Sequence, residues 1–131
     1  MSIEITSLDL IAILKQYKAD KKAVKKDWRN LKSVSAQTPK LIKMAIRQNG
    51  MALEFANIFS TELISLALKK HSMAIRFVPT EYQTEDICRL AIMENYKAID
   101  WINNPSEELV ELAAELEREY LRASVRCIQS Q

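Results

Sequence analysis

The stretch QNGMALEF at residues 48–55 decides the fold, because the chain repeats it with variations. It returns as KHSMAIRF at 70–77 and as ENYKAIDW at 94–101. Aligned outward, the copies begin at residues 41, 63 and 87, and a fourth segment from residue 109 matches in its first half. Self-similarity every 22 to 24 residues predicts a stack of short helical units, none of which buries its apolar face alone.

Each copy begins with a helical pattern and then breaks. Leu41, Met44 and Ala45 are spaced i, i+3 and i+4, which places them in one apolar stripe on a helix, and the other copies keep this spacing. The stripes end at Asn49-Gly50, His71-Ser72 and Asn95-Tyr96. Asn and Gly often end helices in the left-handed conformation, which we expect at these breaks. A short second helix should follow and end at Phe55, Phe77 or Trp101.

Candidate helix starts recur in the same register. They are Thr38-Pro39, Thr61-Glu62, Thr84-Glu85-Asp86 and Ser106-Glu107-Glu108. Ser and Thr side chains cap free N–H groups, Pro suits the first turn, and acidic residues there face the positive end of the helix dipole. We therefore predict that the first helix of each unit begins at these positions.

The two ends of the chain carry modified patterns. Residues 7–18 place Leu10, Ile13, Leu14 and Tyr17 on one helix face, and a second helix over 21–34 aligns Val24, Trp28 and Leu31. A longer helix over 106–128 carries an apolar stripe formed by Leu109, Leu112, Ala113, Leu116, Tyr120, Ala123 and Cys127. We expect these end helices to cap the stack.

The predicted fold is all-α: a small helical-hairpin repeat array, solenoid-like, within a single domain over residues 1–131. The N-terminal capping helices span 7–34, the repeats span 38–59, 60–83 and 84–105, and the C-terminal helix spans 106–128. Composition agrees, since hydrophobic residues make up 48% and charged residues 27%, an ordinary globular balance. One Gly and three Pro leave few turn residues for a strand-rich fold.

Two further expectations concern location. Cys88 and Cys127 form no disulfide framework, which favours reduced thiols and a cytoplasmic protein. The segment MSIEITSLDLIAILKQYK has no basic residues before its apolar run, and that run is short. We therefore expect neither a signal peptide nor a membrane span.

The repeated pattern resembles the short helical repeats of the domain-of-unknown-function 4116 family. QNGMALEF carries the resemblance best, and the similarity covers roughly residues 38–101. The other two copies depart from it at the Asn-Gly break. The resemblance implies a fold of paired short helices and offers no catalytic residues.

No set of residues in the sequence suggests catalysis. His71 takes the place that Asn49 and Asn95 hold in the other copies, so a helix-end role is favoured over a metal ligand or general base. Cys88 and Cys127 lack metal-ligand spacing and fit apolar helix stripes, so we expect both to pack in the interior. We predict no enzyme, no cofactor and no bound metal.

Positive charge gathers near the N-terminus. Residues 1–48 hold 11 Lys and Arg against 4 Asp and Glu. Lys22, Lys25, Lys26 and Arg29 should share one face of the second helix, opposite Val24, Trp28 and Leu31. Such a face fits nucleic-acid phosphates or an acidic protein patch, although a merely solvated face gives the same pattern. We expect no aromatic residue on the exposed side of this face, which disfavours single-strand binding.

Negative charge gathers near the C-terminus, where residues 84–131 hold 10 acidic and 5 basic residues. The candidate acidic face comprises Asp100, Glu107, Glu108, Glu111 and Glu115. It suits a basic protein such as a toxin or nuclease. Solvation and a match to the helix dipole explain the same residues without a partner.

The functional expectation is a non-enzymatic cytoplasmic protein-binding module, most simply an inhibitor or immunity-type antagonist of a toxin or host enzyme. Nucleic-acid binding through the basic face is the alternative. Head-to-tail self-association, basic end to acidic end, is a third. No membrane partner is expected. The step from a repeat array to recognition is an analogy of fold.

Overall fold

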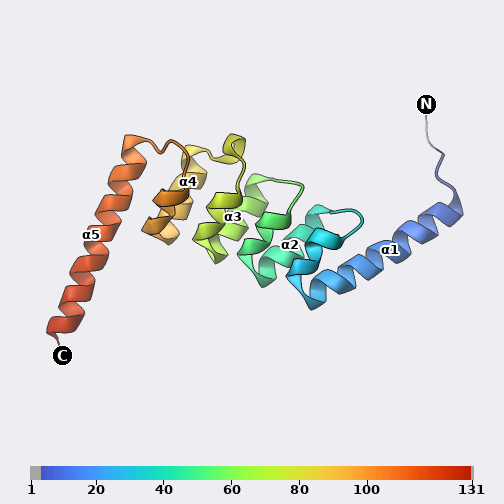
Figure 1. The fold of residues 1–131 in the computed structure, drawn as a ribbon, viewed down its shortest axis with the longest axis horizontal. Coiled ribbons are helices and arrows are strands. Elements are labelled where there is room, and N and C mark those ends of the chain that lie inside the picture. The colour runs from blue at the N-terminus through green and yellow to red at the C-terminus, as the bar shows by residue number, and fades with distance from the viewer. Residues whose placement is uncertain (1–3, 131) are drawn as a thin grey trace.

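A computed structural model describes residues 4–130, and every regular element in that range is helical. The elements are α1 (Ser7–Lys26), η1 (Trp28–Ser33), α2 (Pro39–Gln48), η2 (Gly50–Phe55), α3 (Thr61–Lys70), η3 (Ser72–Phe77), η4 (Thr80–Tyr82), α4 (Glu85–Glu94), η5 (Tyr96–Trp101) and α5 (Glu107–Gln129), where η denotes a 3-10 helix. The all-α prediction is thereby confirmed. Helices α1 and α5 lie at opposite ends, with α2, α3 and α4 between them in chain order (Figure 1).

Side-chain caps start the α-helices close to where the sequence places them. The hydroxyls of Thr38, Thr84 and Ser106 accept the N–H of the third residue of α2, α4 and α5 at 3.2, 3.3 and 3.2 Å. In α3 the cap is Ser60 and not Thr61, because the hydroxyl that reaches the N–H of Leu63, at 3.2 Å, is one residue earlier. Each cap satisfies one of the N–H groups left free at a helix start.

The breaks after the α-helices are extended and not left-handed. Asp27, Asn49, His71 and Asn95 each join an α-helix to a 3-10 helix with φ between −144° and −159°. The expected left-handed ends are therefore wrong, and the only non-glycine residue with positive φ in the described range is Asn104. The physical reason is capping. In the extended conformation the side-chain oxygens of Asn49 and Asn95 accept the N–H two residues ahead, at 2.9 and 3.0 Å.

One apolar core runs through the stack. In α2, α3 and α4 the third, fourth, seventh and eighth residues are buried. These residues are Leu41, Ile42, Ala45 and Ile46, then Leu63, Ile64, Ala67 and Leu68, then Ile87, Cys88, Ala91 and Ile92. Each α-helix contacts the next one along the chain, and η1, η2, η3 and η5 contact in the same order. Neighbouring elements in sequence thus cover one another's apolar faces.

Two glutamines tie neighbouring connectors together. The side chain of Gln37 donates to the carbonyl of Phe55 at 2.6 Å and accepts the N–H of Asn57 at 2.7 Å. Gln83 donates to the carbonyl of Val78 at 3.0 Å and accepts the N–H of Asn103 at 3.3 Å. Each amide satisfies backbone groups that no helix supplies with a partner.

The N-terminal region differs from its prediction. Residues 7–26 form one 20-residue helix, and residues 28–33 form the separate 3-10 helix η1. Extended Asp27 ends the first and caps the second, since its carboxylate accepts the N–H of Arg29 at 2.9 Å. Lys22, Lys25 and Lys26 therefore lie on α1 and Arg29 lies on η1, so the prediction that one helix carries all four is wrong.

The C-terminal helix is less buried than its stripe suggests. Leu109 and Ala113 are buried, but Tyr120, Ala123 and Cys127 are exposed. The prediction that Cys127 packs in the interior is wrong. Helix α5 has 23 residues whereas its neighbour α4 has 10, so the second half of α5 extends past the helix that covers its first half.

Candidate functional site

The open side of α5 is the clearest candidate for a binding surface. The fourth residue is Ile42 in α2, Ile64 in α3 and Cys88 in α4, and each is at most 3% exposed. The corresponding residue of α5 is Val110, which is 49% exposed. The eighth residue is fully buried in α2, α3 and α4, whereas Ala114 of α5 is only half-buried. The positions that bury apolar side chains in the inner helices are therefore uncovered in α5.

Acidic residues lie beside these uncovered positions. On a helix, Glu107 neighbours Val110 and Glu111 neighbours Ala114, each at a spacing of three residues. We define the α5 open face as Val110 and Ala114 together with the exposed acids Glu107, Glu111 and Glu115. Glu108 is also exposed, but it lies on the side of α5 that faces α4 and reaches Arg89 at 3.9 Å. Within residues 4–130, Glu107, Glu111 and Glu115 have no cation within ion-pair distance.

The fifth predicted acidic residue lies elsewhere. Asp100 is on η5 and lines a shallow depression of about 250 Å³ with Tyr96, Lys97, Ile99 and Glu117. Glu117 follows Glu115 by two residues, about half a turn, and so lies on a different side of α5 from Glu111 and Glu115. The structure thus brings four of the five predicted acids onto one helix and separates Asp100 from them.

Ion pairs join consecutive α-helices at equivalent positions. Lys43, the fifth residue of α2, contacts Glu62, the second residue of α3, at 2.9 Å. Arg89, the fifth residue of α4, contacts Glu108, the second residue of α5, at 3.9 Å. The Lys43 ammonium lowers the pKa of the Glu62 carboxyl, first through the hydrogen bond and then through its charge. A cation in the fifth position and an acid in the second is therefore a recurring helix-to-helix contact.

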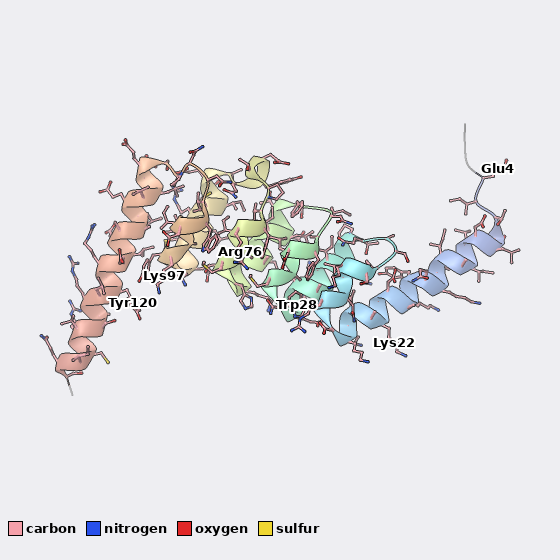
Figure 2. The ribbon with its side chains drawn as sticks, viewed as in Figure 1. Glu4, Lys22, Trp28, Arg76, Lys97 and Tyr120 are labelled. Carbon is pink, nitrogen blue, oxygen red and sulfur yellow. The ribbon has the colours of Figure 1, made fainter. Side chains whose placement is uncertain are left out.

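The basic residues lie at the other end of the molecule. Lys18, Lys22, Lys25 and Lys26 are exposed on α1, and Figure 2 shows Lys22 where α1 meets the body. Arg29 lies over the ring of Trp28, with 5.5 Å between the guanidinium carbon and the ring centroid. The expectation of no aromatic residue beside these cations is wrong, because Trp28 is only half-buried.

Aromatic rings and cations continue along the 3-10 helices. Trp28 stacks on Phe55 at 5.9 Å between centroids, and Lys32 lies 5.7 Å from the Phe55 ring. Arg76 lies 4.7 Å from the ring of Phe77 and 5.4 Å from that of Trp101. In Figure 2, Trp28, Arg76 and Lys97 follow one another along the body. These contacts hold the cations in place by cation–π attraction. We call the resulting surface the 3-10 row, and it consists of Trp28, Arg29, Lys32, Phe55, Arg76, Phe77 and Trp101.

His71 joins two units through its ring. The residue lies at the end of α3, as the sequence predicts for its position. Its Nδ1 accepts the N–H of Gly50 from the preceding unit at 3.1 Å, which places the ring proton on Nε2. Within the described residues, no group of three His, Cys, Asp or Glu side chains lies close enough together to hold a metal ion. The geometry of His71 is that of a structural hydrogen-bond acceptor.

Both long helices expose apolar side chains beyond the stack. The large exposed side chains on the first part of α1 are Leu8, Leu10, Ile11, Ile13 and Leu14, and those on the second part of α5 are Tyr120, Leu121, Val125 and Ile128. Leu10, Ile13 and Leu14, which the sequence predicts to share one helix face, are exposed. The 10-residue helix α2 cannot cover the whole of the 20-residue helix α1.

Comparison of the chain with protein-family models, with curated proteins and with solved structures finds no match. The family resemblance over residues 38–101 therefore stays a prediction. Among the described helices, none combines the length and the apolar character that crossing a bilayer requires. Function has to be argued from the geometry of the surface.

Proposed function

We propose that the chain is a short helical-repeat array that binds another protein through the α5 open face. The observation that carries the proposal is the exposure of Val110. This residue has the same position in α5 as Ile42, Ile64 and Cys88 have in α2, α3 and α4, where they are buried. Burying apolar surface is the main driving force of protein association, and a half-exposed apolar strip at a stack end is where a further element fits.

The charge of the open face indicates the class of partner. Glu107, Glu111 and Glu115 have no cationic partner in the described part of the chain, so a positively charged protein surface would complement them. A basic toxin, nuclease or host enzyme fits this description, and covering its positive surface would inhibit it. Our proposal is that the protein is a non-enzymatic antagonist of such a target and acts in the cytoplasm.

A capture experiment tests the binding function. The tagged chain is incubated with lysate of its source cells, with and without nuclease, and the retained proteins are identified by mass spectrometry. We expect one stoichiometric basic protein that survives nuclease treatment and is lost from the double variant Glu111→Lys, Glu115→Lys. The matched control, Glu54→Lys, Glu81→Lys, changes the net charge equally at exposed sites outside α5 and should retain the partner. Equal retention by both double variants would contradict the proposal.

The 3-10 row favours a second candidate function, which is binding of single-stranded nucleic acid. Trp28, Phe55 and Trp101 offer ring surface, and Arg29, Lys32 and Arg76 offer charge for phosphates. Binding of a labelled oligonucleotide should then weaken steeply with salt and fall about tenfold in Trp101→Ala. Absence of binding at low salt would exclude this function and leave the α5 open face as the binding surface.

A further inference from the structure

The first α-helix has an uncovered side that matches the open side of the last. The third and seventh residues of α2 to α5 are buried, with Leu41, Leu63, Ile87 and Leu109 in the third position and Ala45, Ala67, Ala91 and Ala113 in the seventh. The last ten residues of α1 align with these helices, because Asp27, like Asn49, His71 and Asn95, follows as one extended residue. Their third and seventh residues are Ala19, which is exposed, and Ala23, which is half-buried.

These two uncovered sides differ in the size of their side chains. The α5 open face presents Val110 and Ala114, at the fourth and eighth positions, which are buried in α2, α3 and α4. The uncovered side of α1 presents Ala19 and Ala23. Small residues let helices approach closely, so a valine on one side meets two alanines on the other without a clash.

The charges of the two sides also match, with the signs of the internal contact reversed. Inside the chain, a cation in the fifth position contacts an acid in the second position of the next helix, as in Lys43–Glu62 and Arg89–Glu108. The fifth residue of α5 is Glu111 and the second of the aligned α1 segment is Lys18, and both are exposed. Lys22, Lys25 and Lys26 lie near Lys18 on α1, and Glu107, Glu108 and Glu115 lie near Glu111 on α5.

We propose that the α5 open face binds α1 of a second copy of this chain, so that copies associate head to tail. Val110 and Ala114 pack on Ala19 and Ala23 of the next copy, and Glu111 pairs with its Lys18. The contact is heterologous, so it leaves a free α1 at one end and a free α5 at the other and extends into a linear oligomer or a ring. The inference rests on the face assigned under the proposed function, and not on the identity of any other target.

The protruding parts of the two helices lie outside the paired segments. The internal ion pairs join helices side by side in parallel, and the same orientation aligns residues 17–26 of one copy with residues 107–116 of the other. The extra length of α1 precedes this segment and the extra length of α5 follows it. The extension of α1 therefore lies at the N-terminal end of the paired segments, and the extension of α5 lies at their C-terminal end.

Reciprocal charge reversal tests the contact. Glu111→Lys places Lys against Lys18 of the next copy, and Lys18→Glu places Glu against Glu111, so each variant alone should raise the self-dissociation constant about 3- to 10-fold. In an equimolar mixture the two variants can alternate along the oligomer, so that a Lys faces a Glu at each contact. Association should then return to the wild-type level. The measurement is sedimentation equilibrium over a range of concentrations at low salt, repeated at high salt, where association should weaken.

Controls make each outcome decisive. Val110→Asp should abolish association by placing an unpaired carboxylate in the apolar contact, whereas Leu8→Asp, on a 78% exposed side chain outside it, should have no effect. Circular dichroism verifies that each variant is folded. A wild-type chain that stays monomeric at low salt, or a mixture no more associated than its components, overturns the inference. A basic protein captured by such a monomer would still support the proposed function, so the two failures are distinguishable.

Discussion

At the scale of single residues, the structure explains why the motif that reveals the repeat also departs from its expected conformation. The φ angle of Gly50 is not positive, so a left-handed conformation does not explain why this residue is a glycine. A Cβ atom there would lie 2.5 Å from the carbonyl oxygen of Ala67 and 3.1 Å from Nδ1 of His71. Gly50 is therefore required by the close approach of the next unit.

We expect Gly50→Ala to destabilise the protein. Replacing glycine gains about 0.4–1 kcal/mol from a less flexible unfolded chain, but forcing a methyl group against a backbone carbonyl costs about 1–3 kcal/mol, so the steric cost dominates. Urea unfolding should show a lower midpoint. Ser72→Ala, at the same place in the next unit, is the matched control and should change the midpoint little. Equal effects of the two variants would argue against the close approach.

The two cysteines should react with a thiol reagent at very different rates. Burial, and next the charge of Glu85, raise the pKa of Cys88, which keeps it as the less reactive thiol at neutral pH. Cys127 is exposed. At neutral pH one thiol should react rapidly in the folded protein and the second only with urea, and Cys127→Ser should remove the fast phase. Two fast phases in the native protein would contradict the burial of Cys88.

At the scale of elements, much of the architecture can be predicted from sequence and some of it cannot. Apolar spacing at Leu41, Met44 and Ala45 and the caps at Thr38, Thr84 and Ser106 place the α-helices correctly. The 3-10 form of the second helices depends on the extended cap residue before them. Asn49 is extended because its side-chain oxygen accepts the N–H of Met51, a local hydrogen bond that helix propensity alone does not predict.

The candidate site, too, can be predicted from the sequence only in part. Glu107, Glu108, Glu111 and Glu115 can be predicted to share a helix from their spacing. Val110 carries the argument, and it was missed because a valine in a helix ordinarily indicates core. The available signal was positional: Val110 aligns with Ile42, Ile64 and Cys88, but it lies in the last aligned segment, and the residues described after it continue the same helix.

The Lys43–Glu62 contact between α2 and α3 should be visible in a proton titration. The folded pKa of Glu62 is lowered by Lys43, so the contact stabilises the fold above the unfolded pKa and this contribution is lost as pH falls through the folded value. NMR titration should find that Lys43→Ala returns the Glu62 pKa toward its ordinary value. Lys69→Ala, at an exposed site late in α3, is the control. An unchanged Glu62 pKa in Lys43→Ala would contradict the ion pair.

At the scale of the whole molecule, the order of the units keeps the charge gradient of the sequence. Helix α1, with its lysines, and α5, with its glutamates, lie at opposite ends (Figure 1). Because each α-helix contacts the next one along the chain, these two groups of charges stay apart. Binding to a basic protein and binding to a second copy both follow from this separation, because each places positive charge against the α5 open face.

We expect association to occur at the α5 open face and not at the apolar ends of the long helices. Methyl NMR spectra recorded over a range of protein concentrations at low salt distinguish these two locations. We predict concentration-dependent shifts at the methyl groups of Val110, Ala114, Ala19 and Ala23, which high salt reverses. Shifts confined to Leu10, Ile13 and Leu14 of α1, or to Leu121, Val125 and Ile128 of α5, would contradict the claim, as would spectra that do not change with concentration.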